Sequence, residues 1–195
     1  MPATSPSLLD RLYDNSDPDA WQRLLDLYEP LIRGWLRRHG VRTTDADDLV
    51  QEVLAVVVRR FPDFQHNRRI GAFRAWLRTI TVNVTRDFWK SGRCRPVAPG
   101  GSDFGGYLDQ LADPDNPLSR EWEREHDLHV ARRLLDLIRP EFWDSTWEAF
   151  RRVALDGAAA DTVAAELGMT VNAVFVAKSK VLARLREEAA GLVDQ

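Results

Sequence analysis

The stretch ADTVAAELGMTVNAVFVAKSKVLARLR, residues 160–186, decides the fold of the second half of this chain. An apolar helical pattern stops at Gly168, and a second one begins behind Thr170. Glycine takes the left-handed conformation that a tight turn between two helices needs. The small Ala164 allows the two helices to cross closely. The other positions expected to face inward are also apolar: Val163, Leu167, Met169, Val174 and Ala177. This pattern is typical of a helix-turn-helix, whose second helix enters a DNA major groove, although a plain helical hairpin would bury the same residues.

Length and composition limit the class of protein. A chain of 195 residues holds one large or two small domains. Its single cysteine, Cys94, excludes an internal disulfide and a multi-cysteine zinc site. The first ten residues have neither a basic start nor a long apolar run, and no stretch reaches the apolar length of a membrane span. We therefore expect a cytoplasmic protein without a signal peptide.

Charge is segregated along the chain, although the formal net charge is only −3. Residues 64–95 contain eight basic side chains and one acidic one, whereas residues 101–127 contain eight acidic and two basic ones. The local field matters more than the total when a protein binds a polyanion. The basic segment therefore favours nucleic-acid binding. The acidic segment is interpreted as a solvated surface, with the alternative that it covers the basic surface.

The first ninety residues predict a helical domain over 17–90, preceded by an N-terminal segment, 1–16, with one short amphipathic turn. Asp17 and Pro18 signal the start of a helix that runs to His39, with Pro30 inside it. A second helix opens at Thr44 or Asp45 and closes at 61–62, and a third spans 72–89. The expected buried side of the second helix is Leu49, Val50, Val53, Leu54, Val57 and Val58.

The rest of the chain predicts a flexible acidic linker over 91–120, rich in Pro and Gly, and a second helical domain over 121–195. We expect its first helix to bury Leu128, Ala131, Leu134, Leu135 and Ile138. Pro140 is expected to open the next helix, with Phe142, Trp143, Thr146, Trp147, Phe150 and Val153 facing inward. The predicted fold is all-α: two small helical domains joined by a linker.

No motif indicates catalysis or a cofactor. The sequence has no phosphate-cradling glycine loop after a strand and no nucleophile elbow. His126 and His129 share a helix face at a spacing that suits a metal, but no third ligand lies near them in the sequence. We therefore expect no metal, no cofactor and no catalytic activity.

Three motifs in this order resemble a bacterial RNA polymerase sigma factor of the extracytoplasmic-function group of the sigma-70 family. DADDLVQEVL (45–54) resembles the segment that binds the clamp helices of the polymerase beta-prime subunit, and FRAWLRTITVNVTRDFWK (73–90) resembles the segment that follows it. Residues 142–188 resemble the family's promoter-reading helix-turn-helix. The resemblance covers 17–90 and 121–190. It implies contacts with core polymerase, at the beta-prime clamp helices and the beta flap, and with promoter DNA; an anti-sigma factor is left open as a further partner.

The resemblance also implies roles for individual residues. Core-polymerase contacts are expected from Asp45, Asp48, Leu49, Gln51 and Glu52. Contacts with the melted −10 element are expected from Phe64, Asn67, Arg68, Arg69, Arg74, Arg78, Asn83, Arg86 and Lys90. The −35 element is expected to meet Thr170, Asn172, Phe175, Val176, Lys178, Ser179 and Lys180.

Two other functions fit parts of the sequence. A stand-alone helix-turn-helix regulator that binds duplex DNA without polymerase explains residues 142–188 but leaves 45–90 without a role. A helical adaptor that binds only protein has no need of the basic segment.

Overall fold

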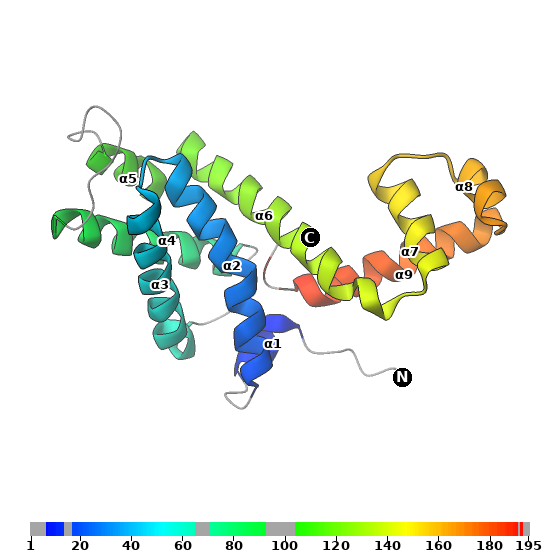
Figure 1. Ribbon diagram of the computed structural model, residues 1–195, viewed down its shortest axis with the longest axis horizontal. Helices are drawn as coiled ribbons and strands as arrows, with labels where there is room; N and C mark the ends of the chain where they lie inside the picture. The colour runs from blue at the N-terminus through cyan, green and yellow to red at the C-terminus, as the bar shows by residue number, and fades with distance from the viewer. Residues whose placement is uncertain (1–6, 14–16, 65–70, 93–103, 191, 193–195) are drawn as a thin grey trace.

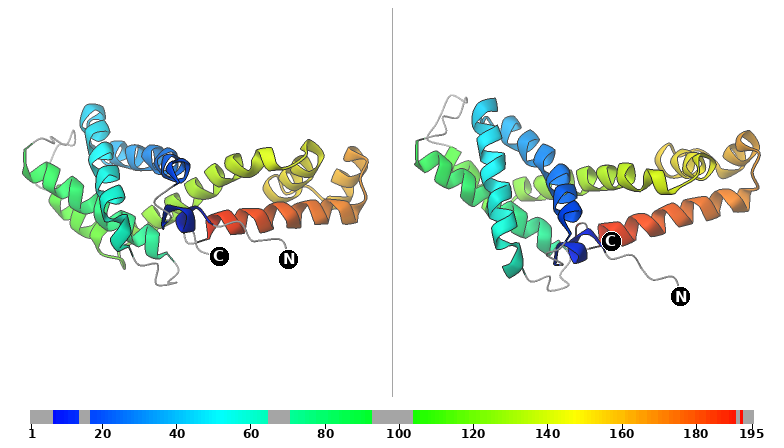
Figure 2. Two further views of the ribbon diagram at one scale, coloured as in Figure 1. Left: turned by 90° about the horizontal axis from the view of Figure 1, so that it is seen from below. Right: turned by 60° about the horizontal axis from the view of Figure 1, so that its bottom comes forward.

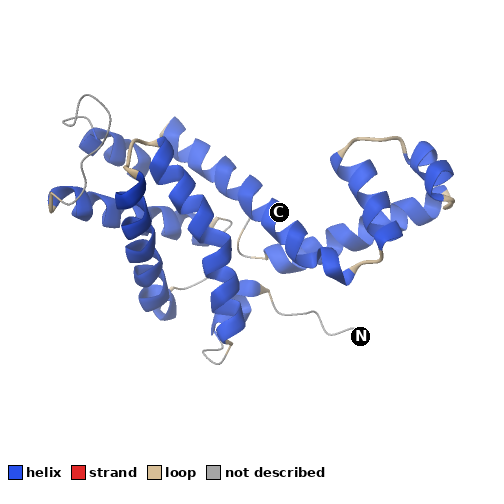
Figure 3. Ribbon diagram, viewed as in Figure 1, coloured by secondary structure: helices blue, strands red, loops and turns tan. Residues whose placement is uncertain are grey.

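The computed structural model describes residues 7–13, 17–64, 71–92, 104–190 and 192, and these residues form helices and turns without a strand (Figure 3). The α-helices are α1 Leu8–Tyr13, α2 Pro18–Arg38, α3 Thr43–Arg60, α4 Ala72–Lys90, α5 Phe104–Ala112, α6 Pro117–Ile138, α7 Asp144–Phe150, α8 Ala160–Leu167 and α9 Val171–Ala189. Single 3-10 turns follow α3 (Phe61–Asp63) and α6 (Arg139–Glu141), and a π-helical turn (Arg151–Leu155) follows α7. The all-α prediction is confirmed.

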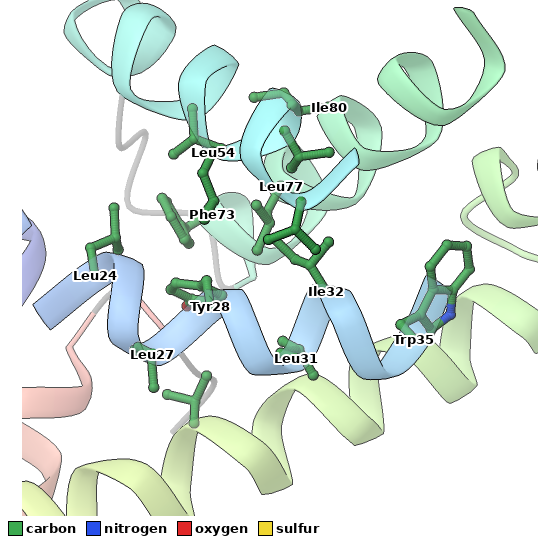
Figure 4. Packing of buried hydrophobic residues seen from close by; sticks show 14 of the residues in the cluster. Leu24, Leu27, Tyr28, Leu31, Ile32, Trp35, Leu54, Phe73, Leu77 and Ile80 are labelled. Carbon is green, nitrogen blue, oxygen red and sulfur yellow. The ribbon is translucent and has the colours of Figure 1, made fainter. Parts of the chain in front are cut away.

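Helix α2 is the centre of the first body. Its start is the predicted one, because the Asp17 carboxylate accepts a hydrogen bond from the Ala20 N–H at 3.0 Å. Pro30 lies inside the helix without ending it. Figure 4 shows α2 with neighbours on two sides: Ile32 points toward α3 and α4, and Leu31 points toward α6. Both faces of this helix are therefore covered, which makes it the support for everything packed around it.

Helices α1, α3 and α4 complete this body at the positions that the sequence predicts, although single residues differ. Leu8, Leu9 and Leu12 of α1 are buried. Val57 of α3 is buried, but Val58, which was expected on the same side, is exposed. Val58 lies at the edge of the buried stripe, about 100° around the helix from Val57, where α2 does not cover it.

The structure differs from the sequence expectation within 91–120. Residues 104–112 form α5, whose Phe104, Leu108 and Leu111 are buried against the first body. Two adjacent glycines lower helix propensity, which is why the sequence favours a loop here. Gly105 has a packing reason: a Cβ at this position would lie 3.1 Å from Cζ3 of Trp89. The burial of three large apolar side chains outweighs the propensity. Residues 93–103 lie outside the described part of the chain.

Helix α6 begins earlier than expected and belongs to both bodies. The Asn116 side chain caps it by accepting a hydrogen bond from the Leu118 N–H at 3.0 Å. After the buried Ser119, its buried residues recur every fourth position: Trp122, His126, Val130, Leu134 and Ile138. Trp122, Val130 and Leu134 lie in the core of the first body, and Ile138 lies in the second. Leu128 was expected to be buried but is 59% exposed, because the buried stripe passes through the polar His126 instead.

The link between α6 and α7 also differs in detail. Pro140 lies in a 3-10 turn, and α7 begins four residues later at Asp144. Trp143 was expected to face inward but is 85% exposed. It occupies the N-cap position, where the backbone is extended, and its side chain is not on the buried face of the helix. Phe142, Trp147 and Phe150 do pack together, against Ile138 and Val181.

The helix-turn-helix is confirmed. Helices α8 and α9 meet at a bend of 104°, with Gly168 at φ 64° between them. Thr170 caps α9, its side-chain oxygen accepting from the Ala173 N–H at 3.1 Å. The five apolar positions singled out in the sequence lie in one cluster with Ala149 and Ala164: Val163, Leu167, Met169, Val174 and Ala177.

The two bodies lie apart and are joined by long helices, as Figures 1 and 2 show. Helix α6 runs from the first body to the second. Helix α9 returns, so that Ala189 and Leu192 reach the core of the first body. Within the described residues, no single helix is long and apolar enough to span a membrane; the bent pair α8–α9 passes that test by length and composition only.

Candidate functional site

An acidic face lies on α3. Asp48 and Gln51 are exposed, and Asp45 and Glu52 are half-buried. Positions three and four apart share one helix face, so Asp48, Gln51 and Glu52 present a single surface. Leu49 was expected to take part in the same contact, but it is fully buried in the core. In this conformation it supports the helix from beneath.

A groove between α2 and α3 borders this acidic face. Its volume is about 460 Å³, and it is lined by Gln22, Leu25, Glu29, Gln51, Leu54, Ala55, Val58 and Arg59. The exposed Val58 belongs to it. Sequence reasoning missed Leu25 and Val58 as surface residues, because apolar residues at helical spacing are normally assigned to the core.

A second groove, between α3 and α4, carries basic and amide side chains. Asn83, Arg86 and Lys90 of α4 line it together with Arg59 and Arg60 of α3, around a volume of about 510 Å³. Glu52 and Asp87 also line it, so the groove is basic on balance, with four cations against two acids. Arg86 donates to the Asn83 side-chain oxygen at 3.3 Å and pairs with Asp109 of α5 at 2.7 Å. Arg59 and Arg60 were missed in the sequence, since basic residues in the last turn of a helix are also explained by the helix dipole.

Arg74 and Arg78 are placed differently from the other basic residues of α4. They are 8% and 5% exposed, respectively. Arg74 pairs with Asp127 at 2.5 Å, and Arg78 pairs with Glu123 at 2.8 Å, both acids being on α6. Two residues expected to meet DNA are therefore covered by α6 in this conformation.

The expected base-capturing loop is only partly described. Phe64 is buried, with its ring centroid 4.8 Å from that of Trp76 and 5.6 Å from that of Phe73. Its carbonyl oxygen accepts a hydrogen bond from the Tyr13 hydroxyl at 2.6 Å. Asn67, Arg68 and Arg69 lie outside the described residues.

Helix α9 presents a mixed surface. Thr170, Asn172, Phe175, Val176, Ser179 and Lys180 are exposed, and Lys178 is half-buried. A shallow groove of about 370 Å³ lies along Asn172, Val176 and Lys180 and reaches Thr146 of α7. Asn and Lys can hydrogen-bond base edges, whereas Phe and Val can contact only the thymine methyl group. This surface therefore offers both polar and apolar side chains to a partner.

The two histidines of α6 connect this helix to α2. His126 Nε2 lies 3.1 Å from the Tyr28 hydroxyl, and its Nδ1 lies 2.9 Å from Asp127. His129 Nε2 lies 2.7 Å from the Leu27 carbonyl oxygen. Burial lowers the pKa of both imidazoles. In the part of the chain that the structure describes, no three His, Cys, Asp or Glu side chains form a group that could hold a metal ion.

These surfaces define an all-helical protein with one acidic contact face, one basic groove and one helix-turn-helix. The model of the family described as "Sigma-70 region 2" matches residues 24–94, which contain the first two surfaces. Among curated relatives, the RNA polymerase sigma factor CnrH of Cupriavidus metallidurans is 28% identical over 71% of this chain and 70% of its own length. The RNA polymerase sigma-E factor of Streptomyces coelicolor is 26% identical over 74% and 71%, respectively. The ECF RNA polymerase sigma-E factor of Haemophilus influenzae is 30% identical over 62% and 66%.

The chain belongs to the sigma-70 family of RNA polymerase sigma factors, in its extracytoplasmic-function group. A solved structure described as "Structure of CnrH in complex with the cytosolic domain of CnrY" is 22% identical and covers 91% of this chain and 92% of that one, with a TM-score of 0.37. The reading as a stand-alone regulator is not favoured, because the matched family region lies outside the helix-turn-helix.

Proposed function

We propose that this chain binds core RNA polymerase and directs it to promoters through two separate DNA contacts. The observation that carries the proposal is that the matched region, residues 24–94, contains both an acidic helix face and a basic groove on adjacent helices. One surface faces protein and the other faces nucleic acid. A regulator that binds DNA alone has no use for the first.

The polymerase contact is assigned to α3. Asp48, Gln51 and Glu52 form the charged part, and the groove beside them supplies apolar contact through Leu25 and Val58. A helical coiled coil such as the beta-prime clamp suits a narrow groove between two helices with charged residues along its rim. The second body is proposed to meet the beta flap, as family membership implies.

The −10 contact is assigned to the groove between α3 and α4. Arg59, Arg60, Arg86 and Lys90 offer cations to phosphates, and Asn83 offers both a donor and an acceptor. The segment 64–71 is proposed to hold a base extruded from the melted strand. Capturing an unstacked base offsets a few kcal/mol of lost stacking and so favours the open promoter. Residues 17–90 and 121–195 remain the proposed domains for the two contacts.

The −35 contact is assigned to the front of α9. Thr170, Asn172, Phe175, Val176, Lys178, Ser179 and Lys180 are proposed to face the major groove, as the second helix of a helix-turn-helix does. Because Phe175 and Val176 cannot bond guanine, we expect steps with thymine methyl groups opposite them.

The role requires binding and no bond-making by the chain itself, so we propose a non-enzymatic initiation factor without a cofactor. Because its partners are polymerase and promoter DNA, we expect the chain to act in the cytoplasm. Family membership alone suggests an anti-sigma factor as a further partner.

The charge-reversed variant Asp48→Lys/Glu52→Lys tests the polymerase contact. We expect at least about a tenfold loss of affinity for core polymerase, since like-charge juxtaposition costs several kcal/mol at an interface. The far-ultraviolet circular dichroism spectrum should not change. Asp19→Lys/Asp136→Lys is the control, because both acids are exposed and lie on α2 and α6 rather than α3. Equal affinity of the two variants for core polymerase would contradict the assignment.

A further inference from the structure

The acidic segment of the sequence pairs with the basic part of the first body. Four of its carboxylates, on α5 and α6, form ion pairs with arginines of α2 and α4. The pairs are Asp109–Arg86 at 2.7 Å, Glu123–Arg78 at 2.8 Å, Glu125–Arg38 at 2.5 Å and Asp127–Arg74 at 2.5 Å. The interpretation of this segment as a solvated face was therefore wrong for the three acids of α6, whereas Asp109 keeps 73% of its side-chain exposure.

The four pairs are not equivalent, since only two of them bury the cation. Arg38 and Arg86 retain 55% and 26% of their side-chain exposure, and such surface pairs contribute little to stability. Arg74 and Arg78 retain 10% and 6%. Glu123 contacts both of these, because its second oxygen lies 3.6 Å from Arg74 Nη2. Two carboxylates of α6 thus pair with the guanidinium groups that were expected to meet DNA.

The carboxylates are held in place by a docked helix and not by flexible side chains alone. Trp122, one residue before Glu123, is 2% exposed, and its ring meets Trp35 edge-on at 5.1 Å. His126, one residue before Asp127, stacks on Tyr28 with ring centroids 5.6 Å apart. Figure 1 shows this half of α6 lying along α2. Arg74 lines an open groove of about 470 Å³ with Arg120 and Arg124 of α6, but its guanidinium group and that of Arg78 are paired with the α6 carboxylates. For DNA phosphates to take the place of these carboxylates, the helix itself must move.

We propose that the part of α6 docked on the first body, Pro117–Leu134, is an autoinhibitory arm of the free chain. Its Glu123 and Asp127 occupy Arg74 and Arg78, and single-stranded DNA binds these arginines only after the arm has left α2 and α4. The inference rests on the proposed role of α4 in the −10 contact. It predicts that DNA can bind Arg86 and Lys90 in the groove between α3 and α4 of the free chain, but cannot bind Arg74 and Arg78.

The variant Glu123→Gln/Asp127→Asn removes the two carboxylates and leaves the apolar docking residues unchanged. A buried guanidinium without its partner is strongly unfavourable, so the arm should open. The first readout is phenylglyoxal modification of Arg74 and Arg78, followed by mass spectrometry of the full-length chain. The second is the affinity of the free chain for a fluorescent mixed-sequence 20-nucleotide single-stranded DNA at low salt.

The matched control is Glu121→Gln/Asp136→Asn, which makes the same charge change on the same helix at two exposed positions. We expect faster modification of both arginines and on the order of tenfold tighter DNA binding in the Glu123→Gln/Asp127→Asn variant, and little change in the control. Adding Arg74→Gln and Arg78→Gln should remove the gain in DNA affinity. The variant Trp122→Ala should give the same two effects through loss of the apolar anchor, provided that its circular dichroism spectrum remains helical.

The proposed arm would be ruled out if Glu123→Gln/Asp127→Asn and Trp122→Ala both remained folded and neither changed the rate at which Arg74 and Arg78 are modified. Faster modification without tighter DNA binding would overturn its inhibitory role and leave α6 as a structural contact. Promoter-dependent transcription by the wild-type chain with core polymerase is measured alongside. That activity tests the proposed function independently of the result obtained for the arm.

Discussion

Single residues show most clearly how this chain combines structure and binding. Gly71 has a φ of 72° at the start of α4, and a Cβ there would lie 2.8 Å from Arg74 Nη2. His126 is fully buried yet has a partner for each ring nitrogen. Gly71 lies against Arg74, and His126 contacts Asp127, so both residues bear on the Arg74–Asp127 ion pair. Both can be tested without DNA.

Substituting Gly71→Ala should destabilise the first body. A non-glycine residue in the left-handed region costs about 1–2 kcal/mol, while the end of the Arg74 side chain can move away from the new methyl group. Urea unfolding measures the free energy. Gly34→Ala is the control, because Gly34 lies inside α2 with nothing within 4 Å of its would-be Cβ. There we expect a gain of about 0.5–1 kcal/mol from helix propensity.

Stability should fall as the pH is lowered from 7.5 to 5.5. Burial lowers the pKa of His126, and the same cause lowers the pKa of His129 and of His39. The unfolded chain therefore takes up protons near the ordinary histidine pKa of about 6.5, which the folded chain does not. The groups facing His126 are Tyr28, Asp127, Arg74 and His129.

The measurement is the urea midpoint at several pH values, and His126→Gln should flatten the curve. Asp127, whose pKa is also lowered, titrates well below this window and does not confuse the result. A midpoint that rises between pH 7.5 and 5.5 would contradict the assignment of a buried neutral imidazole.

The starts of the helices were predicted correctly where the sequence carries a capping residue. Asp17 and Thr170 cap α2 and α9 as their positions predicted. Helix α5 was not predicted, because Gly105 and Gly106 are poor helix formers and only contact with Trp89 explains the first of them. Leu134 and Ile138 of the buried stripe of α6 were predicted, but Trp122, His126 and Val130 were missed, because the polar character of His126 conceals a core position. Sequence patterns report local preference, and these two helices depend on tertiary contacts.

Loss of the α9 cap should weaken the helix-turn-helix. Thr170→Ala removes the acceptor for the Ala173 N–H and should cost about 1 kcal/mol of stability. Thermal unfolding followed by circular dichroism measures this. Thr162→Ala is the control, an exposed threonine inside α8 whose replacement should be neutral within about 0.5 kcal/mol. A larger effect at position 162 than at 170 would contradict the cap.

At the scale of the whole molecule, the sequence predicted two helical modules and the residues of three surfaces, but not how the modules meet. The structure places α6 in the core of the first body, where Glu123 and Asp127 cover Arg74 and Arg78. Such pairing depends on which helices become neighbours, which local patterns do not encode. Segregated charge, basic over 64–95 and acidic over 101–127, was the one available sign of it.

Promoter-directed initiation by this chain is measured by run-off transcription with core polymerase on a library of promoter sequences. We expect transcripts that appear only when the chain is added and that share two sequence elements at −10 and −35. The variant Asp48→Lys/Glu52→Lys should abolish these transcripts. Tight binding of the chain to duplex DNA without any chain-dependent transcript would instead identify a regulator that works without polymerase.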